Sequence, residues 1–225
     1  MKVRRSGERG EFNIDWLKAK YTFSFANYYD PRHMGFRTLR VINNDIIAPE
    51  GGFPTHSHRD MEIISFIIKG ELAHKDSMGN VATITPGMIQ IMSAGSGVSH
   101  SEFNPSSDNE TELFQIWVES KEKGTDPSYS EFHFENRLEK NHLNLIVSSN
   151  RNDDVGYVNQ DIRIYHFDMK DKNFNLDKEK SYWIQLIEGE LEVGDEVLKY
   201  RDAVSLEHET SQVRVKEAKG LLFEF

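Results

Sequence analysis

Four side chains in two short motifs have the chemistry of metal ligands. His56 and His58 lie two residues apart in PTHSHRDME, and His100 and Glu102 lie two apart in GVSHSEF. Side chains two apart on a strand point to the same face, so each pair can bind one ion. Three imidazole nitrogens and one carboxylate oxygen on neighbouring strands would hold a divalent transition metal and leave positions open for water or substrate.

The surroundings of the two pairs strengthen this prediction. With 9 histidines in 225 residues, roughly 0.4 His-x-His pairs are expected by chance, so the spacing alone is a weak signal. The first pair follows GGFP, and the second ends the run PGMIQIMSAGSGVSH, whose glycines permit tight backbone turns. The chain has no cysteine, which leaves histidines and carboxylates as its strong metal ligands.

The charge and the first residues of the chain exclude some classes of function. The formal net charge is -10, from 37 acidic and 27 basic side chains, and the basic residues are scattered. Such a chain repels a polyanion, so we expect no nucleic-acid partner. The start, MKVRRSGERGEF, has no apolar run behind its basic residues. We therefore expect neither a secretory signal nor a membrane span, and a cytoplasmic protein.

Short apolar runs separated by turn residues predict a chain rich in β-strands. The expected strands are 21–25, 38–42, 62–68, 81–84, 89–92 and 113–118. Between Leu72 and Val81 the segment HKDSMGN contains Asp, Ser, Gly and Asn and is expected to form a hairpin loop. Antiparallel strands that follow one another along the chain would produce this pattern.

The second half of the chain repeats the first in outline. IIKGEL at 67–72 returns as LIEGEL at 186–191, each time after an apolar strand. We predict an all-β chain of two similar domains, 1–133 and 134–225. Aligning the two glycines puts Asn175 and Asp177 at the places of His56 and His58, and a residue near Val215 opposite His100. The second domain is therefore expected to lack the metal, with one ion per chain.

Five segments carry a resemblance to a known family: FANYYDP, MGFRTLRVINND, GGFPTHSHRDMEI, QIMSAGSGVSHSEFNPS and LFQIWV. They resemble bacterial pirin-like proteins of the cupin superfamily, densely in the N-terminal half and in outline in the C-terminal half. The resemblance implies a bicupin, with two jelly-roll β-barrels in one chain. Its pattern assigns the metal ligands to His56, His58, His100 and Glu102.

Glu62 is the alternative source of the carboxylate ligand, because in many other cupins that ligand comes from the first motif. It lies four residues beyond His58, so strand parity alone would let it face the same ion. The intact His-x-Glu of the second motif favours Glu102, and Glu62 is then expected to orient an imidazole. The remaining histidines are interpreted as isolated and without a role: His33, His74, His133, His142, His166 and His208.

The resemblance implies a quercetin 2,3-dioxygenase-like oxidoreductase. In that reaction O2 cleaves the central ring of a flavonol and carbon monoxide leaves. Glu102 is the expected catalytic base for the 3-hydroxyl of the flavonol. The resemblance favours Fe(II), while Zn, Mn, Ni or Cu also suits the ligands. The alternative is a metal-binding regulatory module that contacts another protein and has no dedicated substrate.

Overall fold

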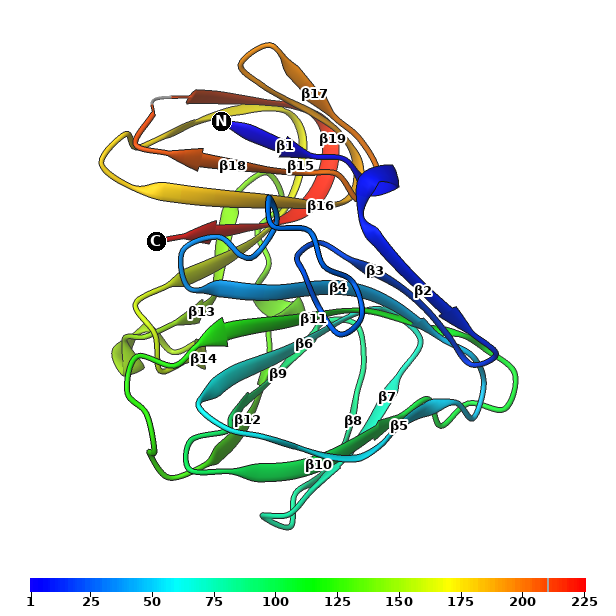
Figure 1. Cartoon of the computed structure of the whole chain (residues 1–225). Helices are drawn as coiled ribbons and strands as arrows, with labels where there is room; N and C mark the ends of the chain where they lie inside the picture. Colours follow the sequence, from blue (N-terminus) through cyan, green and yellow to red (C-terminus); the bar gives the residue numbers. More distant parts are fainter. Residues whose placement is uncertain (210) are drawn as a thin grey trace. The chain divides into compact units, whose positions relative to one another are not determined.

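The structure is a computed structural model that describes residues 1–209 and 211–225, and strands make up most of it (Figure 1). The first strands are β1 (Lys2–Arg4), β2 (Gly10–Ile14), β3 (Leu17–Tyr21), β4 (Leu39–Ile47), β5 (Gly52–His58), β6 (Met61–Lys69), β7 (Leu72–Asp76), β8 (Val81–Ile84), β9 (Met88–Ser93), β10 (Val98–Phe103), β11 (Thr111–Glu119) and β12 (Ser128–His133). They continue with β13 (Leu143–Ser148), β14 (Gly156–Tyr157), β15 (Arg163–Leu176), β16 (Ser181–Val193), β17 (Glu196–Leu198), β18 (Ala203–Glu207) and β19 (Ser211–Glu224). Three short 3-10 helices occur at Ser6–Glu8, Glu135–Arg137 and Arg151–Asp153. No helix in these described residues has the length and apolar character to cross a membrane.

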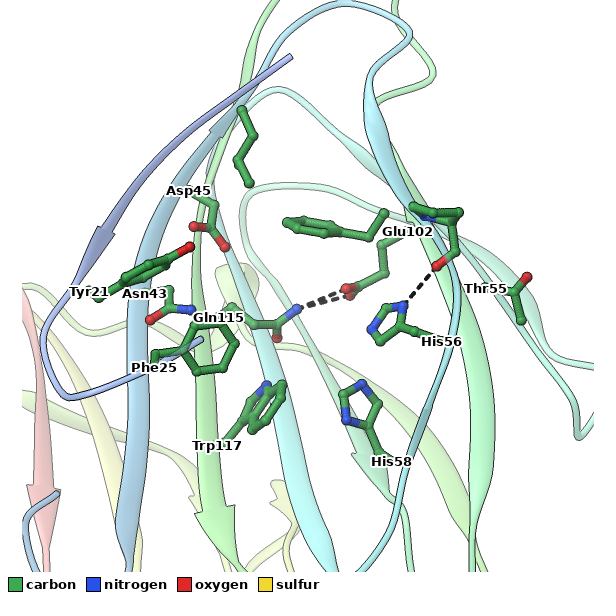
Figure 2. A pocket seen from close by; sticks show the side chains of 13 residues that line it. Tyr21, Phe25, Asn43, Asp45, Thr55, His56, His58, Glu102, Gln115 and Trp117 are labelled. Atoms are coloured by element: carbon green, nitrogen blue, oxygen red, sulfur yellow. Dashed lines mark hydrogen bonds between the residues drawn. The ribbon is translucent and has the colours of Figure 1, made fainter. Parts of the chain in front are cut away.

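The chain forms two compact units, and the N-terminal unit consists of Gly10–Asn136 and Gly156–Gln160. It contains a seven-stranded antiparallel sheet, in the order β12-β9-β6-β11-β4-β3-β2, and a four-stranded sheet, in the order β5-β10-β7-β8. Side chains of both sheets meet in the interior, with Asn43 and Gln115 on the larger sheet and His56 and His58 on the smaller one (Figure 2).

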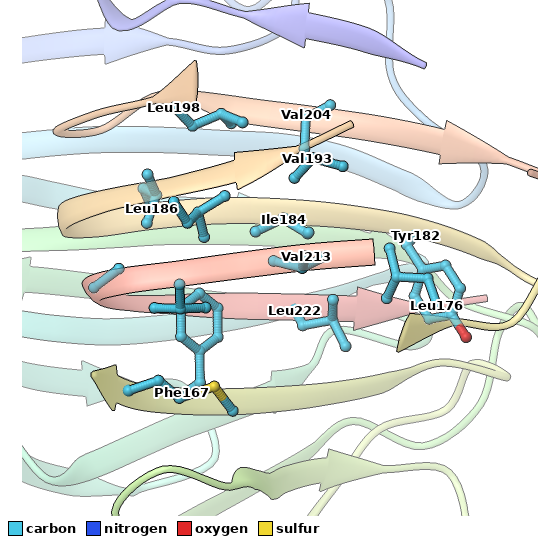
Figure 3. Packing of buried hydrophobic residues seen from close by; sticks show 14 of the residues in the cluster. Phe167, Leu176, Tyr182, Ile184, Leu186, Val193, Leu198, Val204, Val213 and Leu222 are labelled. Atoms are coloured by element: carbon cyan, nitrogen blue, oxygen red, sulfur yellow. The ribbon is translucent and has the colours of Figure 1, made fainter. Parts of the chain in front are cut away.

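The C-terminal unit consists of Met1–Arg9, Arg137–Val155 and Asp161–Phe225. Its sheet runs in the order β1-β18-β16-β19-β15-β13, and β17 pairs with β16. Aliphatic and aromatic side chains from these strands pack into one core, which includes Phe167, Ile184 and Leu222 (Figure 3). The core of this unit is therefore filled by apolar side chains.

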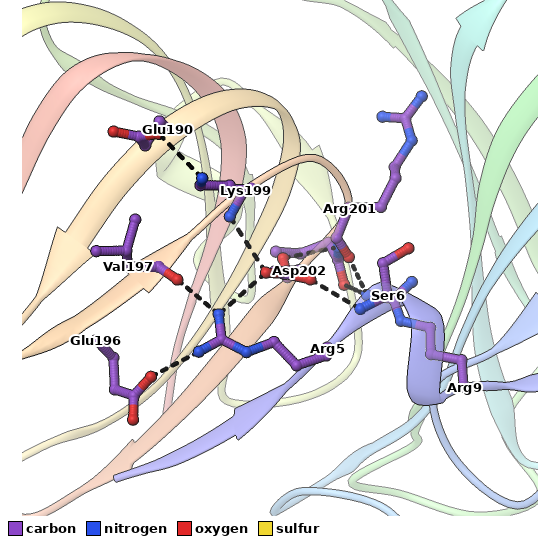
Figure 4. Close-up of polar contacts among 10 residues, drawn as sticks. Arg5, Ser6, Arg9, Glu190, Glu196, Val197, Lys199, Arg201 and Asp202 are labelled. Atoms are coloured by element: carbon purple, nitrogen blue, oxygen red, sulfur yellow. Dashed lines mark hydrogen bonds and ion pairs between the residues drawn. The ribbon is translucent and has the colours of Figure 1, made fainter.

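The first nine residues belong to the C-terminal unit, whereas a single boundary after residue 133 was expected from the sequence. Strand β1 pairs with β18, with Val3 opposite Val204. Arg5 lies 2.6 Å from Glu196 Oε2 and 3.1 Å from Asp202 Oδ2 (Figure 4). Because these partners lie some two hundred residues away, the sequence offers no local signal for the pairing.

The expected hairpin loop after Leu72 is shorter than predicted, since β7 continues through His74 to Asp76. Asp76 Oδ1 accepts hydrogen bonds from the main-chain N–H groups of Met78 at 2.9 Å and Asn80 at 3.0 Å. The turn is thereby confined to the residues between Asp76 and β8. The polar residues of β7 belong to a strand, and two of them face the interior.

Strand β3 ends at Tyr21, although a strand was expected over residues 21–25. The main chains of Phe25 and Tyr28 pair with each other instead, at 3.0 and 2.9 Å, around Ala26 with φ 48°. Strand β4, in contrast, extends five residues past Ile42, to Ile47. This extension brings polar residues of β4 into the interior of the N-terminal unit.

Candidate metal centre

Three of the four predicted ligands have converging ring nitrogens. Strands β5 and β10 run antiparallel with His56 opposite His100 and His58 opposite Val98. Alternate residues of β10 are buried, so His100 and Glu102 point inward while the residues between them do not. His100 Nε2 lies 3.0 Å from His58 Nε2 and 3.1 Å from His56 Nε2.

The spacing of these nitrogens fits one metal ion. Two imidazoles bound at right angles at about 2.1 Å from an ion place their nitrogens ~3.0 Å apart, close to the two separations observed. His56 Nδ1 lies 2.8 Å from the carbonyl oxygen of Pro54. An Nδ1–H that donates to this carbonyl leaves the lone pair of Nε2 free for a ligand bond.

Burial keeps two of the imidazoles neutral, the form that binds a metal. Loss of hydration, together with smaller contributions from His100 and His56, lowers the pKa of His58 to about 4. Burial likewise lowers the pKa of His100 to about 3, with smaller contributions from His56 and His74. Protons therefore do not compete with a metal for these two side chains near neutral pH.

Glu102 is buried in the interior of the N-terminal unit, with an exposed fraction of 2%. The pairing of β10 with β5 is irregular between His100 and Glu102, and Glu102 pairs with Phe53. Gln115 Nε2 donates to both carboxylate oxygens of Glu102, at 3.2 and 2.9 Å, and Ser65 Oγ donates to Oε1 at 3.1 Å. These donors hold the carboxylate in place beside the imidazoles.

The two donors to Glu102 belong to a row of polar residues that crosses the larger sheet. The row is Tyr21 on β3, Asn43 on β4, Gln115 on β11, Ser65 on β6 and Gln90 on β9, and each pairs directly with the next. Within this row, Gln115 and Ser65 support Glu102, and Gln90 contacts His74.

His74 was predicted to be isolated, and the structure shows that this was wrong. Its ligand nitrogen, that of His100 and a carboxylate oxygen of Glu102 all lie within 4.8 Å of one another. Nδ1 lies 2.8 Å from Gln90 Nε2, and Nε2 lies 3.4 Å from Asp76 Oδ2. A Gln90 amide that donates to Nδ1 places the ring proton on Nε2, toward Asp76. His74 thus packs beside His100 with partners for both nitrogens.

Glu62 does not orient an imidazole, although this was expected of it with Glu102 as the ligand. Its carboxylate accepts hydrogen bonds from Ser93 Oγ, from Ser120 Oγ at 2.6 Å and from the main-chain N–H of Asn159 at 3.1 Å. The chain reverses between β5 and β6 at Asp60, which has φ 52°. Parity counted across this reversal does not apply, because the two strands belong to different sheets.

A cavity of about 320 Å³ opens beside the imidazoles, within the size range of small-molecule sites. The rings of Phe25 and Trp117 meet edge to face at 5.3 Å, and Trp117 lies 4.8 Å from the ring of His58. The residues around the cavity are Leu17, Tyr21, Phe25, Asn43, Asp45, Phe53, Pro54, Thr55, His56, His58, Glu102, Gln115 and Trp117 (Figure 2). An apolar, aromatic space therefore borders the candidate ligands.

Both groups of candidate metal ligands among the described residues lie in the N-terminal unit. In the C-terminal unit Asn175 and Asp177 are exposed, and Val215 is buried in the apolar core. One β unit holds candidate metal ligands and the other has an apolar core. This combination is typical of a bicupin with a metal centre in one barrel. The predicted all-β fold of two cupin domains is confirmed by the matches below.

The family model for pirin matches residues 2–118, and the model for the quercetinase C-terminal cupin domain matches residues 145–225. The chain belongs to the pirin family. It is 42% identical to the quercetin 2,3-dioxygenase of Escherichia coli (strain K12), over 85% of this chain and 83% of the relative. It is 38% identical to a pirin-like protein of Caulobacter vibrioides, over 86% of this chain and 85% of the relative.

A solved structure supports the same family assignment. The crystal structure of the bacterial pirin YhhW from Escherichia coli in complex with nickel(II) matches with a TM-score of 0.94 and 37% sequence identity. The match covers 100% of this chain and 98% of the other. The chain is therefore a bacterial pirin of the quercetinase type, similar to proteins that act on quercetin and to one that has been seen with a metal.

Proposed function

We propose that the chain is a metal-dependent dioxygenase of the quercetin 2,3-dioxygenase type, which cleaves a flavonol-like substrate with O2. The observation that carries this proposal is the convergence of three imidazole Nε2 atoms, 3.0 and 3.1 Å apart, at an aromatic cavity. Relatives named quercetin 2,3-dioxygenase, about two fifths identical in sequence, support the same reaction.

His56, His58, His100 and Glu102 would hold the ion. A bound divalent metal supplies a Lewis acid that lowers the pKa of a coordinated hydroxyl group. Fe(II) is our first choice, and Zn, Mn, Ni and Cu fit the same donors. We infer one ion per chain, in the N-terminal unit.

The side chains of the cavity would prepare the substrate for oxygen. Phe25 and Trp117 offer aromatic surfaces against which a planar ring system can pack. Glu102 would accept the proton of the flavonol 3-hydroxyl, because its carboxylate is fixed by Gln115 beside the imidazoles. The resulting electron-rich anion reacts with O2; both oxygen atoms enter the products and carbon monoxide leaves.

The test is aerobic turnover of quercetin by protein loaded with one metal at a time. We expect O2 consumption and release of carbon monoxide in equal amounts, and no consumption of quercetin over time when O2 is removed. His58→Ala and Glu102→Ala should abolish turnover. His133→Ala is the matched control, since His133 is exposed in the same unit.

Unchanged turnover in the metal-replete His58→Ala and Glu102→Ala variants would show that this site is not the catalytic one. Identical quercetin spectra with and without O2 for every metal would contradict the dioxygenase and favour a metal-binding module that contacts a protein partner.

A further inference from the structure

The aromatic cavity beside the imidazoles, called the metal cavity below, borders a second cavity of the N-terminal unit. The second cavity also has a volume of about 320 Å³, and Tyr28, Met34 and Met61 are among the residues around it. In the described part of the chain, Phe25 and Trp117 are the residues that line both cavities. Their rings, which Figure 2 shows next to each other, therefore form the partition between the two spaces.

The second cavity offers apolar surface and no metal ligand. Tyr29 and Met34 at its rim are 73% and 42% exposed, so it is open to solvent. The guanidinium of Arg40 is engaged by main-chain oxygens, that of Ser24 at 3.2 Å and that of Met34. The candidate metal ligands among the described residues all lie outside its lining. A molecule bound at the imidazoles could reach this space only with its remote end.

Phe25 is fixed in the partition by its main chain and by its ring. Its main chain pairs with that of Tyr28 in both directions. The preceding residue, Ser24, donates through Oγ to the carbonyl oxygen of Asp30 at 2.9 Å and accepts from the N–H of Asp30 at 2.8 Å. Besides its contact with the indole, the ring meets that of Tyr21 at 5.2 Å. The partition is therefore a built part of the fold.

The two residues of the partition differ in what else they contact. Trp117 lies 4.8 Å from the ring of His58 and packs against a buried cluster that includes Ile63 and Met92. Phe25 comes from the segment between β3 and β4, and its ring contacts are aromatic side chains rather than imidazoles. Its size can therefore change without a direct change at the candidate ligands.

We propose that Phe25 sets the size limit of the substrate, because its ring ends the metal cavity on the side of the second cavity. This limit rests on the proposed function for the metal-bound end of the substrate. It narrows the substrate class to compact planar aromatic molecules that carry a metal-binding oxygen and no bulky substituent on the side that faces Phe25.

Equilibrium binding to the metal-loaded protein in oxygen-free buffer tests the limit without catalysis. The probes are 3-hydroxyflavone, 7-benzyloxy-3-hydroxyflavone and 4′-benzyloxy-3-hydroxyflavone. All three keep the metal-binding 3-hydroxyl, and the two ethers carry an extra ring at opposite ends of the molecule. By calorimetry the wild type should bind the parent about tenfold or more tightly than at least one ether, because an added ring without room must displace packed side chains.

Phe25→Ala joins the two cavities and should bind one such ether within about threefold of the parent. This should occur because the ether binds more tightly, with the affinity for the parent close to that of the wild type. Phe25→Val removes less of the ring and should relax the preference in the same direction, which keeps the test valid if the Ala variant does not fold. Phe12→Ala is the matched control, since Phe12 is also half-buried, packs against the same core cluster and lines neither cavity.

Carbon monoxide release, measured separately, distinguishes the two proposals. Equal binding of all three probes by the wild type, or a preference that persists in the Phe25 variants, overturns the size limit and leaves the dioxygenase intact. So does a preference that disappears in Phe12→Ala as well, or one that disappears only because the parent binds more weakly. A preference relaxed by the Phe25 variants alone, in protein that releases no carbon monoxide with any metal, supports the limit and contradicts the dioxygenase. A wild type that binds none of the probes contradicts both.

Discussion

The two units of this pirin share a glycine with positive φ in a repeated segment but differ in what fills their interiors. Gly70 in the N-terminal unit and Gly189 in the C-terminal unit have φ of 77° and 87° in the repeated IIKGEL and LIEGEL segments. A Cβ at either position would meet a main-chain oxygen, that of Glu110 or Glu217. Both positions thus require a residue without a side chain.

Beyond these glycines the interiors of the two units differ. The N-terminal interior carries imidazoles, a carboxylate and a row of amide and hydroxyl groups. The C-terminal interior carries apolar side chains such as Ile184, Leu186 and Val215, which form one core. Apolar filling stabilises a fold, whereas buried polar groups contribute little net stability even when paired. The C-terminal core therefore contributes mainly to stability, whereas the N-terminal interior holds the candidate metal ligands.

The largest expected effect comes from a substitution that leaves a cavity in the C-terminal core. Ile184 is fully buried on β16, and Ile184→Ala should destabilise the protein by about 2–5 kcal/mol, against about 0.5–1.5 kcal/mol for Ile184→Val. Denaturant unfolding measures the loss, and metal content measures the N-terminal site. Metal content should be unchanged. A variant that folds but loses its metal would show that the C-terminal core also affects the metal site of the N-terminal unit.

The part of the site that the sequence predicts is the part encoded locally. Residues two apart on one strand share a face whatever the rest of the fold does, and this brings His56 and His58, like His100 and Glu102, to one side of their strands. The all-β class follows from short apolar runs for the same reason. The role of these four side chains as ligands stays a prediction.

The polar residues that support the site could not be predicted from spacing. Gln115 faces Ser65 and Asn43 only because of the register between strands far apart in sequence. His74 and Asp45 stand in polar stretches that favour loops in isolation, and tertiary pairing makes them strand residues. Strand parity fails wherever the chain reverses between two residues, as it does before Glu62.

A smaller effect is expected from a substitution of the glutamine in the polar row that donates hydrogen bonds to Glu102. Gln115→Leu removes two hydrogen bonds to Glu102 and should weaken metal binding or turnover by about 10–100-fold. Competition with a chelator measures the affinity. Gln185 is a buried glutamine of the C-terminal unit, bonded to Arg9 and to main-chain oxygens, and is the matched control. Gln185→Leu should leave metal affinity unchanged; an equal loss in both variants would show that the effect is not local to the row.

The smallest effect is a difference in the pH dependence of stability, measured on metal-free protein. Burial raises the pKa of Asp45 to about 8, so the folded state binds more protons than the unfolded state between about pH 4 and 8. Stability contributed by Asp45 is present below this window and is lost as the pH rises through it. Asp45→Asn should remove a slope of at most about 1.4 kcal/mol per pH unit.

His166 in the C-terminal unit should act with the opposite sign. Burial lowers its pKa to about 4, so the unfolded state binds more protons between about pH 4 and 6.5. Stability contributed by the neutral ring is present above this window and is lost as the pH falls through it. Denaturant midpoints of Asp45→Asn and His166→Asn, each compared with the wild type from pH 5 to 8, should diverge in opposite directions. Parallel curves for the two variants would mean that buried titratable groups do not distinguish the two interiors.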